Sequence, residues 1–359
     1  MKVVVAMSGG VDSSVAAALL KQEGHDVIGM MMRLWSEPGS EAANRCCTPD
    51  AMAQARGVAA ALDIPFYAID GRDVFHTTVV NQFIDGYALG DTPNPCLTCN
   101  RHVRWEFLLN RALAIGADFM ATGHYVRLDR SAGNVVRILR GVDQRKDQSY
   151  ILHVLGQKQL AHAVFPLGMY TKTEVRQLAR DFALPVAERP ESQDLCFLGS
   201  GDYRSFLLRN STGLDSPGPI INQRGDNLGQ HKGLAFYTVG QRKGLGISAN
   251  EPVFVLKKDI KRNTLIVGYS DELGRNNLVA AQVNWVSSSP GDASFPAGVQ
   301  IRYHAQEVAC VITPLAEDRV HVQLNNHLRD ITPGQAAVFY LGEECIGGGI
   351  IQPEENAEK

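Results

Sequence analysis

The 359-residue chain has no apolar run long enough to cross a membrane. Its longer apolar stretches, such as residues 27–32, fall far short of the roughly 20 residues that a membrane-spanning helix needs. Asp12 also interrupts the apolar start of the chain too early for a signal peptide. These absences predict a cytoplasmic protein with no membrane partner.

Two common nucleotide-binding signatures are absent as well. No Gly-Lys-Ser or Gly-Lys-Thr string occurs anywhere, which excludes a Walker A loop, and no G-x-G-x-x-G string opens a helix. The net charge of −3 is not that of a chain that is basic throughout, although it leaves room for a local basic patch.

The seven cysteines are an odd number, and the chain shows no export signal. A structural disulfide framework is therefore not expected, and cysteines that gather in the fold would be catalytic or metal-binding. Cys310 and Cys345 fall in β-rich segments, which predicts core positions, and the adjacent Cys46 and Cys47 are interpreted as loop thiols.

The length of the chain and its hydrophobic content of 45% predict several buried cores and more than one domain. Through the first two hundred residues, short β-branched runs alternate with helical patterns, which is typical of a parallel sheet covered by helices. Strands are expected at residues 3–7, 27–32, 66–69 and 119–122, and helices at 15–20, 51–62, 73–87, 105–115 and, after a capping box at 171–174, to about 182.

After about residue 208 the pattern changes to an all-β one. Gly and Pro become frequent, and short alternating segments such as 254–256, 264–267, 308–312 and 320–324 follow one another between turn signals. This spacing favours small barrels. We therefore expect three domains, at 1–209, 210–273 and 274–359.

The string Ser8-Gly9-Gly10-Val11-Asp12-Ser13 lies between the first expected strand and the first expected helix. Glycines there allow a tight turn, and the N–H groups that open a helix form an anion site. The two serine hydroxyls add donors for phosphate oxygens, and Asp12 could hold Mg²⁺ bridging those oxygens. The string therefore predicts a nucleotide site.

This string resembles the PP-loop of the N-type ATP pyrophosphatases. Further strings are similar to those of one family in that group, the tRNA-specific 2-thiouridylases, and they run from residue 6 to beyond 300. They are Asn94-Pro95-x-x-x-Cys99-Asn100, Ala121-Thr122-Gly123-His124-Tyr125, Lys146-Asp147-Gln148-Ser149-Tyr150, Ser192-Gln193-Asp194-Leu195-Cys196-Phe197, residues 238–246, and Arg302-Tyr303.

The resemblance implies an α/β, parallel-sheet PP-loop domain of the adenine nucleotide α-hydrolase type, followed by two small β-rich domains, the last a β-barrel. It also implies a reaction that replaces the 2-oxygen of the wobble uridine of tRNA with sulfur, after ATP has adenylated that oxygen. The sulfur would travel as a persulfide on Cys196, and Cys99 would discharge it by forming a disulfide with Cys196. The partners would be the tRNA and a sulfur donor, either a protein or sulfide.

The resemblance assigns further residues by position. The expected ATP contacts are Ala6, Met7, Ser8, Gly9, Gly10, Val11, Asp12, Ser13, Met32 and Gly123. The expected contacts with tRNA or its target base are Asn94, Pro95, Cys96, His124, Lys146, Asp147, Gln148, Arg302, Tyr303 and Gln335.

The surroundings of Cys99 and Cys196 favour reactive thiols over buried ones. Cys99 is expected in a polar, Pro-bounded turn close to Arg101 and Arg104, and positive charge stabilises a thiolate. Cys196 follows Ser192-Gln193-Asp194, which is also expected to be a loop.

Cys96 departs from the familiar pattern, because many members of the family carry Asp at this position. The resulting Cys96-Leu97-Thr98-Cys99 string puts the acid–base role of that Asp in doubt. With Cys196, it supplies three thiolates, which suit Zn²⁺ or a [4Fe–4S] cluster with one open iron. An idle thiol beside a catalytic one is the alternative.

Residues 224–262 hold eight Lys and Arg against three acidic residues, which is a local excess of five positive charges. This concentration predicts a phosphate-contacting patch in the central domain. Two other functions remain open: a PP-loop ligase acting on a small molecule, and a non-catalytic RNA-binding protein that senses nucleotide.

Overall fold

The computed structural model describes residues 1–38, 48–131, 133–190, 195–198 and 202–354. Its first sheet contains β1 (Lys2–Ala6), β2 (Asp26–Arg33), β3 (Phe66–Asp70), β4 (Phe119–Ala121) and β7 (Ala163–Val164). The strands lie in the order β3-β2-β1-β4-β7, and every pairing is parallel. The four strands expected from the sequence are confirmed, and the short β7 is an addition to them.

Alternate residues of β1 face two different hydrophobic cores, as the two-residue period of a strand requires. Val3 and Val5 pack with α1 (Val11–Gln22), α2 (Pro49–Ala61) and α9 (Lys172–Asp181). Val4 packs on the other face of the sheet, against two rows of helices. The parallel sheet is therefore buried between two helical layers.

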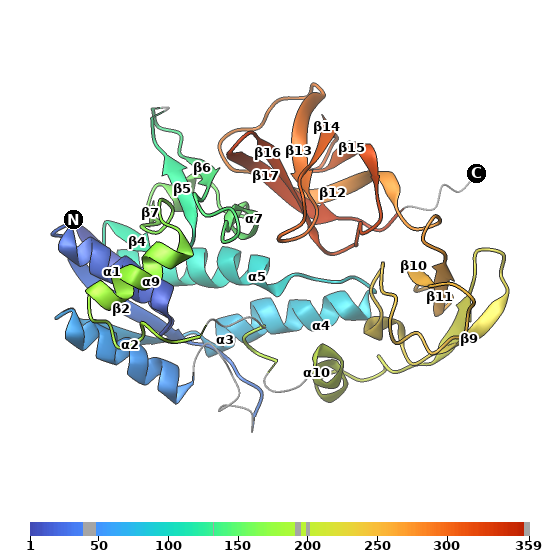
Figure 1. Cartoon of the computed structure of the whole chain (residues 1–359), viewed down its shortest axis with the longest axis horizontal. Coiled ribbons are helices and arrows are strands. Elements are labelled where there is room, and N and C mark those ends of the chain that lie inside the picture. The colour runs from blue at the N-terminus through green and yellow to red at the C-terminus, as the bar shows by residue number, and fades with distance from the viewer. Residues whose placement is uncertain (39–47, 132, 191–194, 199–201, 355–359) are drawn as a thin grey trace.

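Two long helical rows cover this second face and extend beyond the sheet (Figure 1). One row is α3 (Arg72–Phe75), η1 (His76–Val80) and α4 (Asn81–Ala88). The other is α5 (Pro95–Thr98), η2 (Cys99–Leu108) and α6 (Leu109–Ala114). Both η1 and η2 are π-helices, a rare form that is often found at functional sites.

The second row begins ten residues before the helix expected at 105–115, so the expected polar turn around Cys99 is wrong. The Asn94 side chain accepts a hydrogen bond from the Cys96 N–H at 3.1 Å, and Pro95 occupies the first helical position. Asn as N-cap and Pro at the first position are strong helix-start signals. Cys96 and Cys99 therefore lie within the first turns of a helical row.

The central part of the chain forms a separate four-stranded sheet. Its strands are β8 (Gly218–Ile221), β9 (Asn227–His231), β10 (Phe254–Asp259) and β11 (Thr264–Gly268), in the order β10-β11-β8-β9. The pairing of β11 with β8 is parallel, and the others are antiparallel. The helix α10 (Tyr203–Asn210) leads into this sheet, and the 3₁₀ helix η3 (Leu234–Phe236) follows β9.

The last part of the described chain is a closed barrel of six strands. They are β12 (Arg275–Trp285), β13 (Phe295–Gln300), β14 (Val308–Pro314), β15 (Val320–Leu328), β16 (Ala336–Leu341) and β17 (Glu344–Ile351), and β12 pairs with both β15 and β17. The predicted fold class, an α/β domain followed by β-rich parts that end in a barrel, is confirmed. No helix in the described ranges is long and apolar enough to cross a membrane.

A hairpin from the first half of the chain extends the barrel sheet. It consists of β5 (Val126–Asp129) and β6 (Arg137–Arg140), and β6 pairs with β17. The short helices α7 (Ser149–Leu152) and α8 (Gln157–Leu160) follow it. The nucleotide-binding part and the barrel are therefore joined by main-chain hydrogen bonds, which the sequence did not predict.

Candidate active site

The carboxyl ends of β1 and β4 lie side by side at one edge of the parallel sheet. From β1 the chain runs to β2 and β3 on one side, and it returns to β4 on the other. In open α/β sheets, ligands bind in the crevice outside such a reversal. The PP-loop (residues 8–13) follows β1, Gly123 follows β4, and Met32 lies near the end of β2. The fold thus gathers the expected ATP contacts at one place.

Hydrogen bonds within the PP-loop hold its shape. The Ser8 N–H donates to Ser13 Oγ at 3.1 Å, and the Ser14 hydroxyl donates to the Gly10 carbonyl at 2.8 Å. Gly9 has a φ of +72°, in the left-handed region that favours glycine. No side chain caps α1, whose N-cap is Gly10. The first N–H groups of α1 are therefore suited to bind a phosphate.

Lys172 is a residue of this site that the sequence motifs did not identify. Its Nζ donates to both carboxylate oxygens of Asp12, at 2.6 and 2.9 Å, and the Tyr125 hydroxyl donates to Asp12 Oδ1 at 2.6 Å. The predicted capping box of Thr171 and Glu174 is confirmed, and it sets Lys172 at the first position of α9. A cation there opposes the helix dipole. That mismatch is the signal that could have pointed to Lys172.

The two cysteines expected to be catalytic, Cys99 and Cys196, are half-buried, and no disulfide joins them to each other in this structure. Both Cys99 and Cys196 pack against the same hydrophobic core, which also covers the second face of the parallel sheet. Cys96 is exposed, and the Asn100 amide donates to its carbonyl at 3.0 Å. Folding therefore brings Cys99 and Cys196, distant in sequence, to the border of one core.

The remaining cysteines divide as the sequence predicted, where the structure describes them. Cys310 and Cys345 are buried, and burial raises the pKa of the Cys310 thiol to about 12 and that of Cys345 still further. Their predicted core positions are confirmed. Cys46 and Cys47, together with residues 192–194 of the Cys196 string, lie outside the described residues.

The described ranges contain no group of three or more His, Cys, Asp or Glu side chains arranged to hold a metal ion. Cys96, Cys99 and Cys196 thus do not form a ready three-thiolate site there. The iron–sulfur hypothesis gains no support from this arrangement.

Three family models match successive parts of the chain. The model described as the tRNA methyl transferase HUP domain matches residues 1–200, the tRNA methyl transferase PRC-barrel domain matches 205–269, and the aminomethyltransferase beta-barrel domain matches 275–351. The protein named tRNA-specific 2-thiouridylase MnmA in Pelotomaculum thermopropionicum is 46% identical over 98% of this chain and 97% of its own length. Its namesake in Moorella thermoacetica is 47% identical over 97% and 99%. The chain belongs to the tRNA-specific 2-thiouridylase family.

Solved structures show weaker likeness. A 4-thiouridine synthetase in complex with RNA and bound ATP matches with a TM-score of 0.37 and 17% identity over 58% of this chain and 50% of that one. An NMN synthetase from Francisella tularensis matches with a TM-score of 0.35 and 16% identity over 53% and 66%. These values are too low to bear on the function of this 2-thiouridylase family member.

His124, which the 2-thiouridylase resemblance assigns to tRNA, is buried here, with 5% of its surface exposed. Arg104 Nη1 lies 3.1 Å from His124 Nε2, and Thr122 Oγ1 lies 2.7 Å from His124 Nδ1. Burial above all, and then the charge of Arg104, hold the pKa of His124 well below its usual value. The imidazole is therefore neutral, and little of its surface is open to RNA in this structure.

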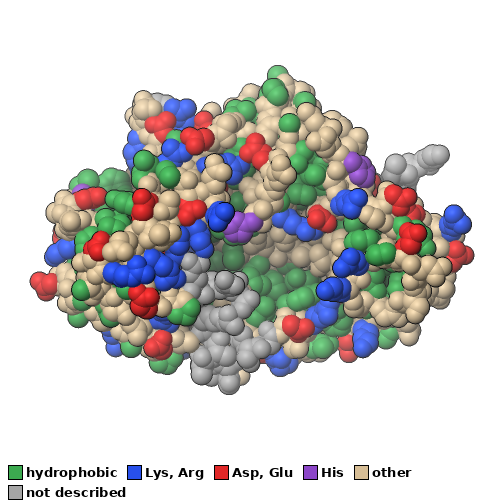
Figure 2. Space-filling view, in the orientation of Figure 1, with side chains coloured by type: hydrophobic (Ala, Val, Ile, Leu, Met, Phe, Trp, Pro, Cys, Tyr) green, Lys and Arg blue, Asp and Glu red, His purple; other side chains and the backbone are tan. Residues whose placement is uncertain are grey.

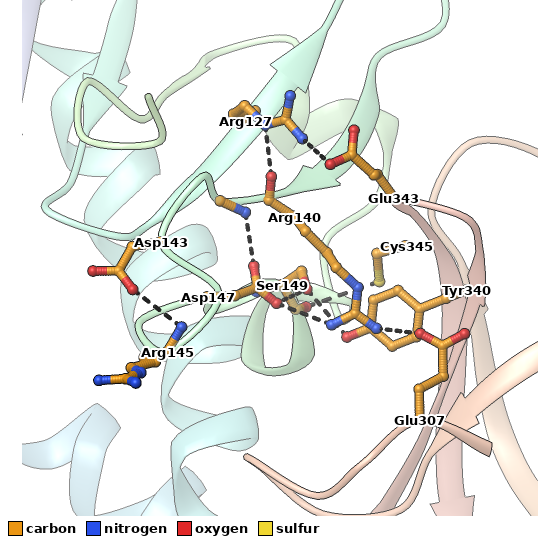
Figure 3. A network of polar contacts seen from close by, with 11 residues as sticks. Arg127, Arg140, Asp143, Arg145, Asp147, Ser149, Glu307, Tyr340, Glu343 and Cys345 are labelled. Carbon is orange, nitrogen blue, oxygen red and sulfur yellow. Dashed lines mark hydrogen bonds and ion pairs between the residues drawn. The ribbon is translucent and has the colours of Figure 1, made fainter. Parts of the chain in front are cut away.

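Asp147, another expected tRNA contact, is buried in a polar network between the β5–β6 hairpin and the barrel (Figure 3). Its carboxylate accepts hydrogen bonds from the Gly141 N–H at 2.9 Å and the Ser149 hydroxyl at 2.6 Å. The Arg140 guanidinium lies 3.4 Å from the same carboxylate and stacks 3.6 Å from the Tyr340 ring centre. Asp147 thus joins two parts of the fold, while its neighbour Lys146 is half-buried.

Gln148 and Gln335 also bind protein groups in this structure. Gln148 Oε1 accepts the Tyr125 N–H at 3.0 Å, and Gln335 Nε2 donates to the Thr92 carbonyl at 2.7 Å. The Thr92 N–H donates to the Pro333 carbonyl at 2.9 Å. The barrel therefore holds the segment directly before Asn94 and Pro95, the stretch that the family resemblance places against the target base.

Arg302 and Tyr303 remain accessible on the barrel. Arg302 donates to Thr332 Oγ1 at 3.0 Å and pairs with Asp330 at 3.5 Å, while Tyr303 is 36% exposed. Figure 2 shows a hollow in the middle of the molecule, with Lys and Arg side chains along its borders. A negatively charged chain such as RNA would meet favourable charge on this face.

Proposed function

We propose that this protein uses ATP to replace the 2-oxygen of the wobble uridine, U34, of tRNA with sulfur. The observation that carries this proposal is the PP-loop at the sheet edge, in a chain whose thiols Cys99 and Cys196 border the adjoining core. Similarity to 2-thiouridylases over nearly the full length supports it. We also propose that residues 1–209 perform the chemistry and that 210–273 and 274–359 hold the tRNA.

The first step would activate a poor electrophile. Uridine O2 attacks the α-phosphorus of ATP, the new O2–P bond forms, and the bond to the β-phosphate oxygen breaks to release pyrophosphate. The PP-loop would bind the phosphates through its N–H groups and hydroxyls. Carboxylate oxygen is a ligand that Mg²⁺ prefers, so Asp12 fits the role of holding it. Because both Asp12 oxygens bind Lys172 here, Mg²⁺ would replace Lys172 at one of them.

The second step would deliver sulfur. The Cys196 thiolate would take the outer sulfur from a persulfide on a donor protein, whose own cysteine leaves as a thiol. The terminal persulfide sulfur on Cys196 then attacks C2 of the base, and AMP leaves with the former O2. The Cys99 thiolate then attacks the Sγ of Cys196, which leaves 2-thiouridine and a Cys99–Cys196 disulfide. An external thiol must reduce that disulfide before the next cycle. Both side chains are half-buried, and no disulfide joins one to the other in this structure, as this cycle requires at its start.

Cys196→Ser tests the proposal most directly. A serine hydroxyl carries no transferable sulfur, so we expect this variant to release pyrophosphate with tRNA present but to form no 2-thiouridine. The measurements are pyrophosphate release and mass spectrometry of tRNA nucleosides after incubation with ATP, Mg²⁺ and a sulfur source. Normal 2-thiouridine formation by Cys196→Ser would exclude Cys196 as the sulfur carrier.

The same assays separate the other candidate functions. Pyrophosphate exchange without tRNA would favour a ligase that acts on a small molecule, and no tRNA-dependent pyrophosphate release would favour a nucleotide sensor. Anaerobic reconstitution tests the [4Fe–4S] alternative. If the wild type takes up no more iron than a variant with Cys96, Cys99 and Cys196 all changed to Ala, a cluster held by these thiols is excluded.

A further inference from the structure

Arg104 and Cys99 lie on the same face of the π-helix η2. In a π-helix the turns close between residues five apart, and the Leu109 N–H donates to the Arg104 carbonyl five residues earlier. Residues five apart therefore lie one above the other. Arg104 is five residues after Cys99, so its side chain leaves the helix one turn beyond the thiol on the same side.

The guanidinium of Arg104 has no carboxylate partner among the described residues. Among the residues that the structure describes, its hydrogen bond to His124 is its one polar contact, and it forms no ion pair with an acidic side chain. The Arg104 side chain is half-buried, so part of its surface stays open to a ligand. Such a group favours a bound anion.

His124 orients this guanidinium without neutralising it. A guanidinium can only donate hydrogen bonds, so His124 Nε2 must be the acceptor, and the proton of the neutral ring lies on Nδ1. That proton is donated to Thr122 Oγ1. The ring of Phe165 contacts the rings of both His124 and Trp105, so apolar surface lies beside the His124 imidazole. Four of the five N–H donors of Arg104 remain for another ligand.

Its contact with His124 links Arg104 to the strand end beside the PP-loop, and η2 also carries Cys99. Gly123, the preceding residue, lies so close to the PP-loop that a Cβ there would be 2.7 Å from the Ser13 nitrogen. Lys172, another cation of this site, is already paired with Asp12. Arg104 is therefore a cation near this crevice that forms no ion pair with a described acidic side chain.

We propose that Arg104 binds the α-phosphate of the nucleotide, in ATP and then in the adenylated uridine, and that His124 is a positioning residue for it. This inference rests on the proposed adenylation. Negative charge builds on the non-bridging oxygens of the α-phosphate in the transition state of the attack by O2, and AMP gains negative charge when sulfur displaces it. A guanidinium held in a half-buried site stabilises that charge in both steps. A tRNA backbone phosphate offers the same chemistry, and the experiment below distinguishes the two sources.

The test compares Arg104→Met and Arg104→Lys with Arg111→Met, a control that removes an exposed arginine from the same helical row. We measure tRNA-dependent pyrophosphate release in single turnover, and the Kd for tRNA by fluorescence anisotropy. Arg104→Met should slow release about 10²- to 10³-fold, the usual effect of removing one donor to a developing anion. Its tRNA affinity should stay within threefold of wild type, Arg104→Lys should recover part of the rate, and Arg111→Met should match wild type.

His124 variants test the positioning role. His124→Gln keeps an acceptor for Arg104 and should release pyrophosphate within about tenfold of the wild-type rate, whereas His124→Leu should lose most of what Arg104→Met loses. Thermal unfolding confirms that each variant is folded. Two results overturn the inference: an Arg104→Met rate equal to wild type, or a loss of tRNA affinity as large as the loss of rate, which would make the ligand an RNA phosphate.

Failure of the proposed function gives a different result. If the wild type itself releases no pyrophosphate with any tRNA, adenylation is excluded. Arg104 is then judged by the Kd for ATP alone, measured by calorimetry. An Arg104→Met Kd within threefold of wild type would overturn its role in phosphate binding, and a clear weakening would support it.

Discussion

Replacing Gly123 with Ala tests whether the strand end supports the PP-loop. A Cβ at this position would lie 2.7 Å from both the Asp12 carbonyl carbon and the Ser13 nitrogen, and 3.0 Å from the Asp12 Cβ. The φ of Gly123 is outside the left-handed region, so alanine can adopt this backbone without strain. The clash is with the backbone of the PP-loop itself, which must therefore move.

The size of the effect follows from that displacement. Carbon atoms in ordinary contact lie about 3.5–4.0 Å apart, so the loop must move by roughly 1 Å. Inserting a methyl group into a close-packed site costs about 1–3 kcal/mol. Because bound phosphate would hold the loop N–H groups at hydrogen-bond distance, we expect the cost to fall on nucleotide binding. It corresponds to about 5- to 150-fold in the Kd for ATP.

Isothermal titration calorimetry with Mg²⁺ and ATP measures this Kd. The control is Gly57→Ala in α2, where the nearest atom to an added Cβ is 4.0 Å away and alanine is the better helix former. We expect the control to bind ATP like wild type and both variants to unfold cooperatively. If Gly123→Ala binds ATP with a Kd within twofold of wild type, the close approach of β4 does not shape the nucleotide site.

Three further perturbations test other parts of the structure. Lys172→Met should slow pyrophosphate release by at least tenfold, with tRNA affinity unchanged, because Asp12 loses its cationic partner; an unaltered rate would make the pair purely structural. Changing the exposed Lys261 and Arg262 together to Gln should weaken tRNA binding and make its logarithmic salt slope less steep by about two, and an unchanged slope would show that they contact no phosphate. Lys258 belongs to the same basic segment but donates to the Tyr237 carbonyl at 3.0 Å, and burial lowers its pKa to about 8. Between that value and the ordinary 10.5, the unfolded chain holds a proton that the folded chain has released, so stability should rise with pH; urea unfolding at pH 8, 9 and 10 should show this rise in wild type and less of it in Lys258→Met.

The sequence alone determined those elements that are fixed by residues close together in the chain. The strand at 3–7, the PP-loop and the capping box of Thr171 depend on side-chain alternation, glycine and helix caps within a few residues. The switch to β structure after residue 208 is also a property of composition and turn spacing. The helix start at Pro95 belongs to the same class, since Asn94 and Pro95 are an N-cap and a first helical residue.

Only the tertiary structure decided which distant groups meet. Asp12 and Lys172 are 160 residues apart, and no periodicity or cap relates one to the other. His124 contacts Arg104, and Asp147 contacts Arg140 beside the barrel, only in the folded chain. Motif similarity predicted that both residues contact RNA, and it could not show that both are buried. Pairing of β6 with β17 joins segments about two hundred residues apart, and the entropy of closing such a loop is repaid only by the complete sheet. Residues so far apart in the chain meet because whole helices and strands pack together. The residues next to them in the sequence do not specify this packing.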